Sequence, residues 1–346
     1  MPHSGSMGAT SPESRRRNRG APGTSLGTVS RFARHSFWLR VAPSAGEVAE
    51  HATRAMRLVG RVHGGGDAPF PALAGTALDA FIGLQRIGTP SKRAWDKAPP
   101  VLPWIPDAPS TSRRAGLVWH ERDPYGPRGI DQVFLRVVVP QGFGSLAEEI
   151  RQVLWTVPPG RCPEPEEAAA LFIVAIFEGL FRAGERAAAG LARLRPLLPV
   201  GRDLRTALGA PFPGDVLEEF RRTCRSMLLL LPREQPFVYN PQWPRVGRLA
   251  ASDGDFIAGR TLYDVKCLDP RKGSLSREHL FQMLGYACMN ACDPFGHQLG
   301  ALGFLNPRAG FAWSMQLEAF CRALGAGSFN TVLQLFREET RAHVSD

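Results

Sequence analysis

The sequence predicts an α/β (α+β) protein, in which a small mixed β-sheet is flanked by helices and preceded by a helical N-terminal region. Three observations predict this class. Helical periodicity dominates the chain up to about residue 231, short strand-like runs separated by turn residues follow, and one helical run lies between those strands. The 346 residues, of which 44% are hydrophobic, suffice for the core of one large domain or two small ones.

The first predicted elements are helices. We expect folded sequence to begin near Val29, with Phe32, Phe37 and Leu39 as the first buried side chains. The spacing of apolar residues then predicts helices over 47–61, 70–86, 146–155, 163–183 and 215–231. We expect the last of these helices to be capped near Gly214–Asp215.

Composition divides the chain into three parts. Residues 1–28 are poor in apolar side chains and carry an arginine run, which predicts a disordered basic tail. Residues 29–235 form the mainly helical region, with a long loop rich in Pro and Ser at 88–112 and an alternating strand-like run at 132–139. Residues 236–340 contain the remaining strands.

The C-terminal part alternates strands with one internal helix. Residues 237–249 contain two prolines and are predicted to be extended. A hairpin over 252–266 follows. Ser276 is the expected N-cap of a helix that continues to about Asn290. Strands over 299–305 and 311–317, separated by a turn, and a C-terminal helix complete the predicted order.

The hairpin places acidic side chains together. Pairing is counted outward from a two-residue turn at Gly259–Arg260. The predicted pairs are Ala258 with Thr261, Ile257 with Leu262, Phe256 with Tyr263, Asp255 with Asp264, and Asp253 with Lys266. Because side chains alternate along a strand, one face carries Asp253, Asp255, Asp264 and Lys266.

This acidic face predicts a metal site. Two carboxylates directly opposite each other destabilise a sheet, and a divalent cation such as Mg²⁺ between them would remove the repulsion. A nearby lysine can stabilise charge that develops on a reacting group. Basic residues in this chain are nearly all arginine, and lysine occurs only at Lys92, Lys97, Lys266 and Lys272.

The hairpin resembles the PD-(D/E)XK nuclease superfamily, in particular its RecB-type branch. Asp255 matches the first acid of that motif, and Asp264-Val265-Lys266 matches its acid-x-Lys element. Gln282 and Tyr286, on the following helix, match the Gln-xxx-Tyr element of the RecB-type branch. The resemblance covers roughly residues 240–290 and implies a restriction-endonuclease-like core.

The resemblance implies a role for each matching residue. Asp255 and Asp264 would bind Mg²⁺, or Mn²⁺, together with the carbonyl oxygen of Val265, and Lys266 would orient water or stabilise the transition state. Gln282 and Tyr286 would lie beside the active site and contact DNA, and His279 shares their helix face. Asp253 is an alternative first acid or a supporting metal ligand.

Two further assignments stay open. The superfamily often adds an acid from an earlier helix, for which the candidates are Asp79, Glu178, Glu185 and Glu218. Cys288, Cys292 and His297 could form a zinc site, but the absence of a CxxC pair favours buried thiols. Trp243 and Trp313 could stack on bases, although core packing is the favoured interpretation.

Charge favours a polyanionic partner. The net charge is +10 and the pI about 9.9, which favours nucleic acid over a membrane. No apolar run has transmembrane length, and six scattered cysteines without a secretory signal predict a cytoplasmic protein with reduced thiols. We therefore expect a DNA nuclease of defence or repair, with any motor subunit on a separate chain. The alternatives are an inactive nucleic-acid-binding protein on the same fold, and a regulatory protein with surface aspartates.

Overall fold

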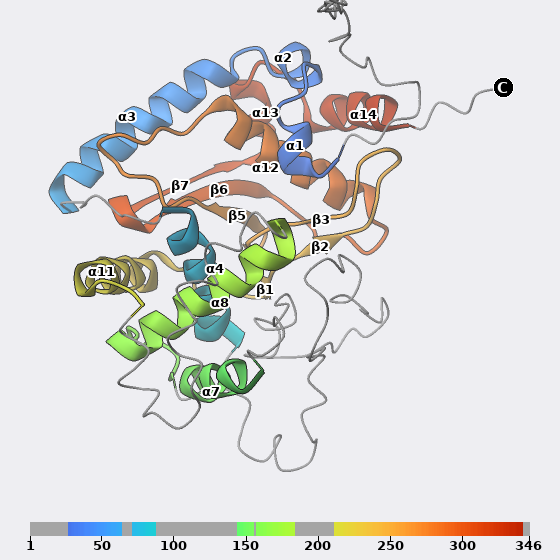
Figure 1. The fold of residues 1–346 in the computed structure, drawn as a ribbon. Helices are drawn as coiled ribbons and strands as arrows, with labels where there is room; N and C mark the ends of the chain where they lie inside the picture. Colours follow the sequence, from blue (N-terminus) through green and yellow to red (C-terminus); the bar gives the residue numbers. More distant parts are fainter. Residues whose placement is uncertain (1–26, 64–70, 88–143, 156, 184–210, 342–346) are drawn as a thin grey trace, which may run out of the picture.

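A mixed five-stranded sheet forms the centre of the protein (Figure 1). The structure is a computed structural model that describes residues 27–63, 71–87, 144–155, 157–183 and 211–341. The spatial order of the strands is β1 (Phe237–Tyr239), β4 (Phe256–Ala258), β5 (Thr261–Val265), β6 (Ala301–Asn306) and β7 (Phe311–Gln316). Strands β5 and β6 are parallel and the other neighbours are antiparallel. The predicted small mixed sheet flanked by helices is confirmed.

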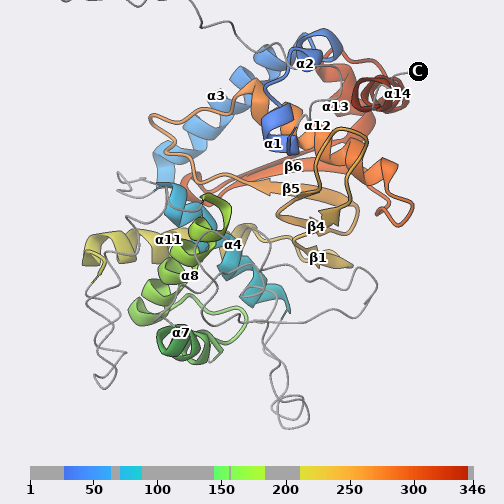
Figure 2. The same ribbon diagram turned by 45° about the vertical axis from the view of Figure 1, so that its right-hand side comes forward.

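Helices cover both faces of the sheet (Figures 1 and 2). One face carries α4 (Pro71–Ile87), α7 (Gly144–Trp155), α8 (Pro165–Ala183) and α11 (Gly214–Leu230). The other face carries α1 (Val29–Phe32), α2 (Phe37–Val41), α3 (Ala45–His63), α12 (Arg277–Cys292), α13 (Leu317–Ala323) and α14 (Phe329–Thr340). The predicted helices agree with these bounds to within two residues at most ends, as periodic apolar spacing leads one to expect.

Strand alternation divides the buried side chains into two cores. Phe256, Tyr263 and Leu305 face the layer of α4, α7, α8 and α11, which we call the first core. Ile257, Leu262 and Phe304 face the layer that contains α12, which we call the second core. Helices from the N-terminal region contribute to both cores, so both layers are needed to bury the sheet.

The hairpin register is confirmed at three pairs and ends at the fourth. Phe256 pairs with Tyr263, Ile257 with Leu262, and Ala258 with Thr261, around Gly259 at φ +57°. Asp255 lies just outside this ladder, and its carbonyl accepts the N–H of Asn240 at 2.8 Å. The turn at Gly259 and the three inner pairs of the hairpin were therefore predicted correctly, whereas the outer end of the hairpin was not.

The predicted pairing of Asp253 with Lys266 is wrong. Asp253 pairs instead with Gln242, in a separate two-stranded sheet of β2 (Gln242–Trp243) and β3 (Ser252–Asp253). The cause is Gly254, where an added Cβ would lie 2.9 Å from the Trp243 ring, and whose N–H donates to the carbonyl of Pro241 at 2.9 Å. The chain leaves the hairpin at this glycine to pass beneath the indole ring.

Three smaller predictions are corrected. The C-terminal helix is two helices, α13 and α14, because the chain turns at Gly325 and Gly327, both with positive φ. Leu39 is 46% exposed, whereas Phe32 and Phe37 are buried as expected. The residue before α11 is Pro213, which offers no side-chain cap.

Some predictions fall on residues that the structure does not describe. These are the tail before residue 27, the segment 88–112 and the strand at 132–139. Within the described ranges, no helix combines the length and the apolar character that crossing a membrane requires.

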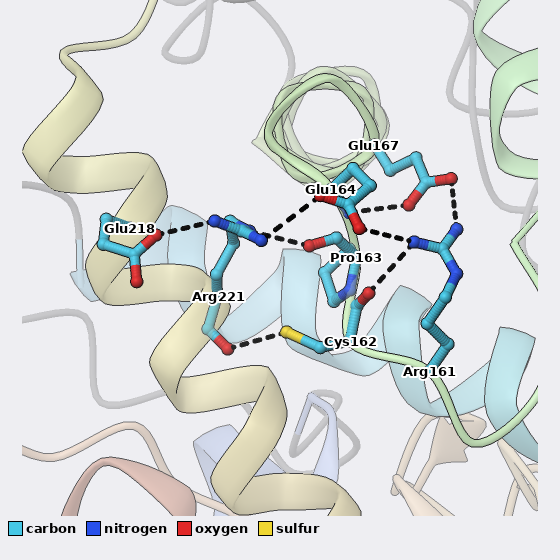
Figure 3. Close-up of polar contacts among 7 residues, drawn as sticks. All are labelled: Arg161, Cys162, Pro163, Glu164, Glu167, Glu218 and Arg221. Carbon is cyan, nitrogen blue, oxygen red and sulfur yellow. Dashed lines mark hydrogen bonds and ion pairs between the residues drawn. The ribbon is translucent and has the colours of Figure 1, made fainter.

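A network of opposite charges joins α8 to α11 beside the first core (Figure 3). Arg161 forms ion pairs with Glu164 at 3.2 Å and with Glu167 at 2.5 Å. Arg221 of α11 pairs with Glu164 at 3.3 Å and donates to the carbonyl of Pro163 at 2.8 Å. Arg221 links α11 to the start of α8, which is distant in the chain, whereas Arg161 pairs with acids three and six residues away and fixes the start of α8.

Candidate active site

Two carboxylates meet at the end of the β4–β5 hairpin. Asp264 lies on β5 with its side chain 4% exposed, on the face toward the second core. Asp255 reaches the same strand from the chain before β4, because its Oδ2 accepts the backbone N–H of Val265 at 2.6 Å. The hydrogen bond thus replaces the missing ladder pair and keeps the two acids together, as the sequence predicted for Asp255 and Asp264.

The proximity of the acids changes their ionisation. Burial and, next in size, the negative charge of Asp264 raise the pKa of Asp255 to about 7. The charge of Lys266 and the hydrogen bond from Val265 act in the opposite direction on that pKa, without cancelling the rise. The negative charge of Asp253 also raises the pKa of Asp255. Asp253 therefore interacts electrostatically with Asp255 although it belongs to another sheet.

Lys266 neutralises part of this acidic charge. Its Nζ lies 2.8 Å from Oδ2 and 3.1 Å from Oδ1 of Asp264, and 3.4 Å from Oε1 of Gln282. Burial by itself would lower the pKa of Lys266, but the charges of Asp264 and Asp255 outweigh it and the pKa is raised. The lysine is therefore held as an ammonium group between the carboxylates and α12.

Helix α12 brings Gln282 and Tyr286 to the lysine. The side-chain amide of Gln282 donates to the Tyr286 hydroxyl at 2.8 Å and to the Ser30 hydroxyl at 3.2 Å. Burial raises the pKa of Tyr286, so the phenol stays protonated. Asp264, Lys266, Gln282 and Tyr286 thus form one continuous polar chain, which joins the predicted residues of the hairpin to those of the helix.

Packing beneath Tyr286 fixes its position. The rings of Tyr286 and Trp243 stack with centroids 5.1 Å apart, and the Trp243 indole donates to the Asn290 side chain at 3.2 Å. Trp243 is 2% exposed, which confirms its predicted role in core packing. Trp313 is only partly buried and packs against the second core.

The start of α12 is also fixed. Ser276 is the N-cap, as predicted, and its backbone N–H donates to Nδ1 of His279 at 3.0 Å. Burial lowers the pKa of His279, and the charge of Lys266 lowers it further, so the imidazole is neutral near pH 7. His279 therefore caps the helix in the arrangement seen here.

A cleft of about 460 Å³ opens beside Lys266. Its other lining residues are Ser30, Arg34, Ser276, Glu278, His279 and Gln282. Sequence reasoning missed Ser30, Arg34 and Glu278. No local signal could have found the first two, since they lie about 250 residues from Gln282 in the sequence.

The candidate helical acids do not supply a described carboxylate at this cleft. Asp79 lies on α4, whose apolar residues pack into the first core, on the other side of the sheet. Glu218 of α11 forms an ion pair with Arg221 at 2.8 Å. The side chain of Glu178, and all of Glu185, lie outside the described residues.

Burial keeps the Cys267 and Cys288 thiols protonated by raising their pKa values. Cys267 follows Lys266 but packs against the first core, and burial raises its pKa to about 12. Burial also raises the pKa of Cys288. Cys292 is partly buried. The backbone N–H of His297 donates to the side chain of Asn290 at 2.9 Å.

The carboxylates suit a hard divalent cation. Asp264 Oδ2 is buried and, although it lies close to Lys266, receives no aligned hydrogen bond. Mg²⁺ typically takes one or two protein carboxylates and completes its shell with water and phosphate oxygens, which Asp255 and Asp264 match. Across the described part of the chain, no three His, Cys, Asp or Glu side chains are grouped closely enough to hold a metal by themselves. Any such ion would therefore depend on water or substrate for its other ligands.

Comparisons with protein-family models, with curated proteins and with solved structures find no match to this chain.

Proposed function

We propose that the protein is a metal-dependent nuclease that hydrolyses phosphodiester bonds of DNA. The observation that carries this proposal is the grouping of Asp255 and Asp264 with Lys266, which lines an open cleft. The chain order β1–β4–β5–α12–β6 supports the restriction-endonuclease-like core that the resemblance implies, with the acid-x-Lys element at the end of β5 and the Gln-xxx-Tyr element on α12. Sequence motif and chain topology therefore support the same proposal.

In this proposal, each polar group has a defined task. Asp255 and Asp264, with the carbonyl oxygen of Val265, hold Mg²⁺ or Mn²⁺. When bound, the metal lowers the pKa of water and neutralises charge on the phosphate. Asp253, which belongs to β3, acts on Asp255 through its negative charge and is the candidate for a supporting metal ligand. Lys266, already ionised and pointed at Asp264, orients the attacking water or stabilises negative charge in the transition state.

Gln282 and Tyr286 position this lysine and the substrate strand. Gln282 accepts from Lys266 and donates to Tyr286, so its amide has one fixed orientation. A fixed amide leaves Lys266 little rotational freedom, which favours one geometry in the transition state. The net charge of +10 favours DNA as the polyanionic substrate, with any motor subunit on a separate chain.

The proposal is tested by cleavage of supercoiled and linear DNA with Mg²⁺, Mn²⁺ or EDTA. We expect Lys266→Met to lower the cleavage rate by at least about 100-fold. Lys272→Met is the matched control, because it removes the same charge from an exposed turn and should change the rate less than about 2-fold. Equal rates for the two variants, or cleavage that persists in EDTA, would show that this site is not the source of activity.

One observation favours a second candidate, a nucleic-acid-binding protein with the same fold and no catalysis. No acid from an earlier helix lies at the cleft among the residues described. Metal-dependent DNA binding without cleavage under any of these conditions would select this candidate. A regulatory protein, the third possibility, predicts neither metal dependence nor DNA affinity beyond the general effect of charge.

A further inference from the structure

We infer that the N-terminal segment Gly27–Arg34 forms one wall of the active cleft, and that Arg34 binds a backbone phosphate of the nucleic-acid strand there. The inference rests on the proposed function for the identity of the ligand. It extends the site to a segment outside the region of resemblance, about 230 residues before the acid-x-Lys element.

The segment is anchored where it enters the fold. The carbonyl of Gly27 accepts the N–H of Ala250 at 2.8 Å, and the N–H of Val29 donates to the Ser252 hydroxyl at 3.0 Å. Val29 and Phe32 are each 1% exposed within the second core. These contacts join the segment to the chain just before Asp253 and Asp255, so the wall and the acids share one support.

The segment also lies directly on α12. An added Cβ at Gly285 would lie 3.0 Å from a methyl group of Val29, so only glycine permits this close approach without a shift of the neighbouring side chain. One turn earlier on α12, the Ser30 hydroxyl accepts from Gln282. Ser30 thus extends the polar chain of Lys266 and Gln282 toward the cleft wall.

Arg34 projects a cation into the same cleft. Its side chain is exposed and lines the cleft together with Ser30, Lys266 and His279. Within the described residues, Arg34 forms no ion pair with an acid, whereas Lys266 is committed to Asp264. A guanidinium group that is not neutralised by a carboxylate is well suited to bidentate phosphate binding.

The acidic groups at the site favour such a cation. Glu278 lines the cleft and Asp264 lies behind Lys266, and the negative charge of these carboxylates opposes a polyanionic strand. A strand that approaches Lys266 therefore gains from a second cation in the same cleft, where the phosphate can be held before any reaction occurs. Arg34 supplies this charge from the N-terminal segment, which is separate from the hairpin and from α12.

The test compares Arg34→Gln with Arg40→Gln in the full chain. Arg40 is the matched control, because it is also an exposed arginine near the N-terminus, in α2, but pairs with Glu339 at 3.5 Å. Binding of a fluorescent DNA duplex is measured by anisotropy in EDTA over a range of KCl concentrations. We expect about 5- to 10-fold weaker binding for Arg34→Gln, a salt slope reduced by about one, and less than about 2-fold change for Arg40→Gln.

The outcomes separate this inference from the proposed function. Equal affinities for the two variants would overturn the inference even if the wild-type protein cleaves DNA. A selective loss for Arg34→Gln supports it, including the case in which the wild-type protein cleaves nothing and only the nuclease proposal fails. A wild-type protein that binds no DNA in EDTA would overturn the inference, whereas the cleavage assay with Mg²⁺ or Mn²⁺ decides the nuclease proposal. Thermal unfolding should give equal midpoints for the variants, since both side chains are exposed.

Discussion

The two sides of the central sheet use charged residues in opposite ways. Beside the first core, acids and bases alternate: Arg161 lies between Glu164 and Glu167, and Arg221 lies between Glu164 and Glu218 (Figure 3). On the side of the second core, Asp255 and Asp264 lie together with Lys266 as the cation paired with them. The first arrangement lowers the electrostatic energy of the fold, and the second raises it.

This difference separates stability from function. A carboxylate whose pKa is raised to about 7 is held in an environment that disfavours its charged form, and such groups concentrate at functional sites. The paired network stabilises the arrangement of α8 and α11 without facing a cleft lined by Lys266. We therefore expect substitutions beside Lys266 to affect mainly catalysis and substitutions in the paired network to affect mainly stability.

The largest expected effect is on catalysis, at Asp264. Asp264→Asn should lower the cleavage rate by about 1000-fold, because the site loses the acid that pairs with Lys266 and would hold the metal. The free energy of unfolding should change by less than about 1 kcal/mol, since the amide oxygen can still accept from Lys266 and the repulsion of Asp255 disappears. Rates come from the plasmid assay, and stability comes from urea denaturation.

Asp215→Asn is the control for this substitution, because Asp215 is exposed in the first turn of α11. It should leave the cleavage rate unchanged. A similar loss of rate in both variants, or a loss of stability at Asp264 that matches the loss of rate, would contradict the separation of the two roles.

The next largest effect is on stability, at Arg308. Its side chain is 4% exposed, follows β6, and donates to Glu219 of α11 at 2.7 Å. Arg308→Met leaves the acid without its cation in a nearly buried position and should cost about 3 kcal/mol of unfolding free energy. Arg271→Met is the control, because that arginine is 54% exposed and its ion pair should contribute less than about 1 kcal/mol. Equal losses of unfolding free energy in the two variants would show that burial does not determine how much these ion pairs stabilise the fold.

Sequence reasoning identified the parts of the site that are local in the chain. A two-residue turn fixes the first three pairs of the hairpin, so Asp264, Lys266 and the neighbourhood of Asp255 follow from counting residues. Helical spacing then places Gln282 and Tyr286 on one face of α12. Periodicity over long segments likewise identified most helices of both cores.

The parts that could not be predicted depend on contacts between distant segments. The hairpin ends at Asp255 because Gly254 packs under Trp243, and no rule for hairpins contains that tertiary contact. Ser30 reaches the site through a contact with Gln282 that spans 252 residues, and the partners of Arg221 and Arg308 are also remote in sequence. Composition reveals that charges exist but not which of them are paired.

A smaller effect is expected from pH, at Asp255. Its pKa is near 4 in the unfolded chain and about 7 in the folded one, so the native state binds more protons between these values and stability falls as pH rises through this window. Asp255→Asn removes this loss, and its amide oxygen can still accept from Val265. We compare the free energy of unfolding of the variant with that of the wild type at each pH. The difference in favour of the variant should be about 2 kcal/mol larger at pH 8 than at pH 5.

Urea denaturation in EDTA at the two pH values measures this difference. Added Mg²⁺ should stabilise the wild-type protein more at pH 8 than at pH 5, because the cation competes with the proton at Asp255. If Asp255→Asn changes the free energy of unfolding by the same amount at both pH values, the environment of Asp255 does not disfavour its charged form.

The smallest effect is expected at Glu167, in the paired network. One oxygen accepts from Arg161, and the other accepts the N–H of Glu164 at 2.7 Å at the start of α8. Glu167→Ala removes both charge-assisted bonds and should lower the unfolding free energy by about 1 kcal/mol, with an unchanged cleavage rate. Glu166→Ala, in the same first turn of α8, removes an equal charge near the positive end of the helix dipole and so controls for that effect. If Glu166→Ala costs as much as Glu167→Ala, the helix dipole accounts for the stabilisation, and the network of Figure 3 adds little to the stability of the first core.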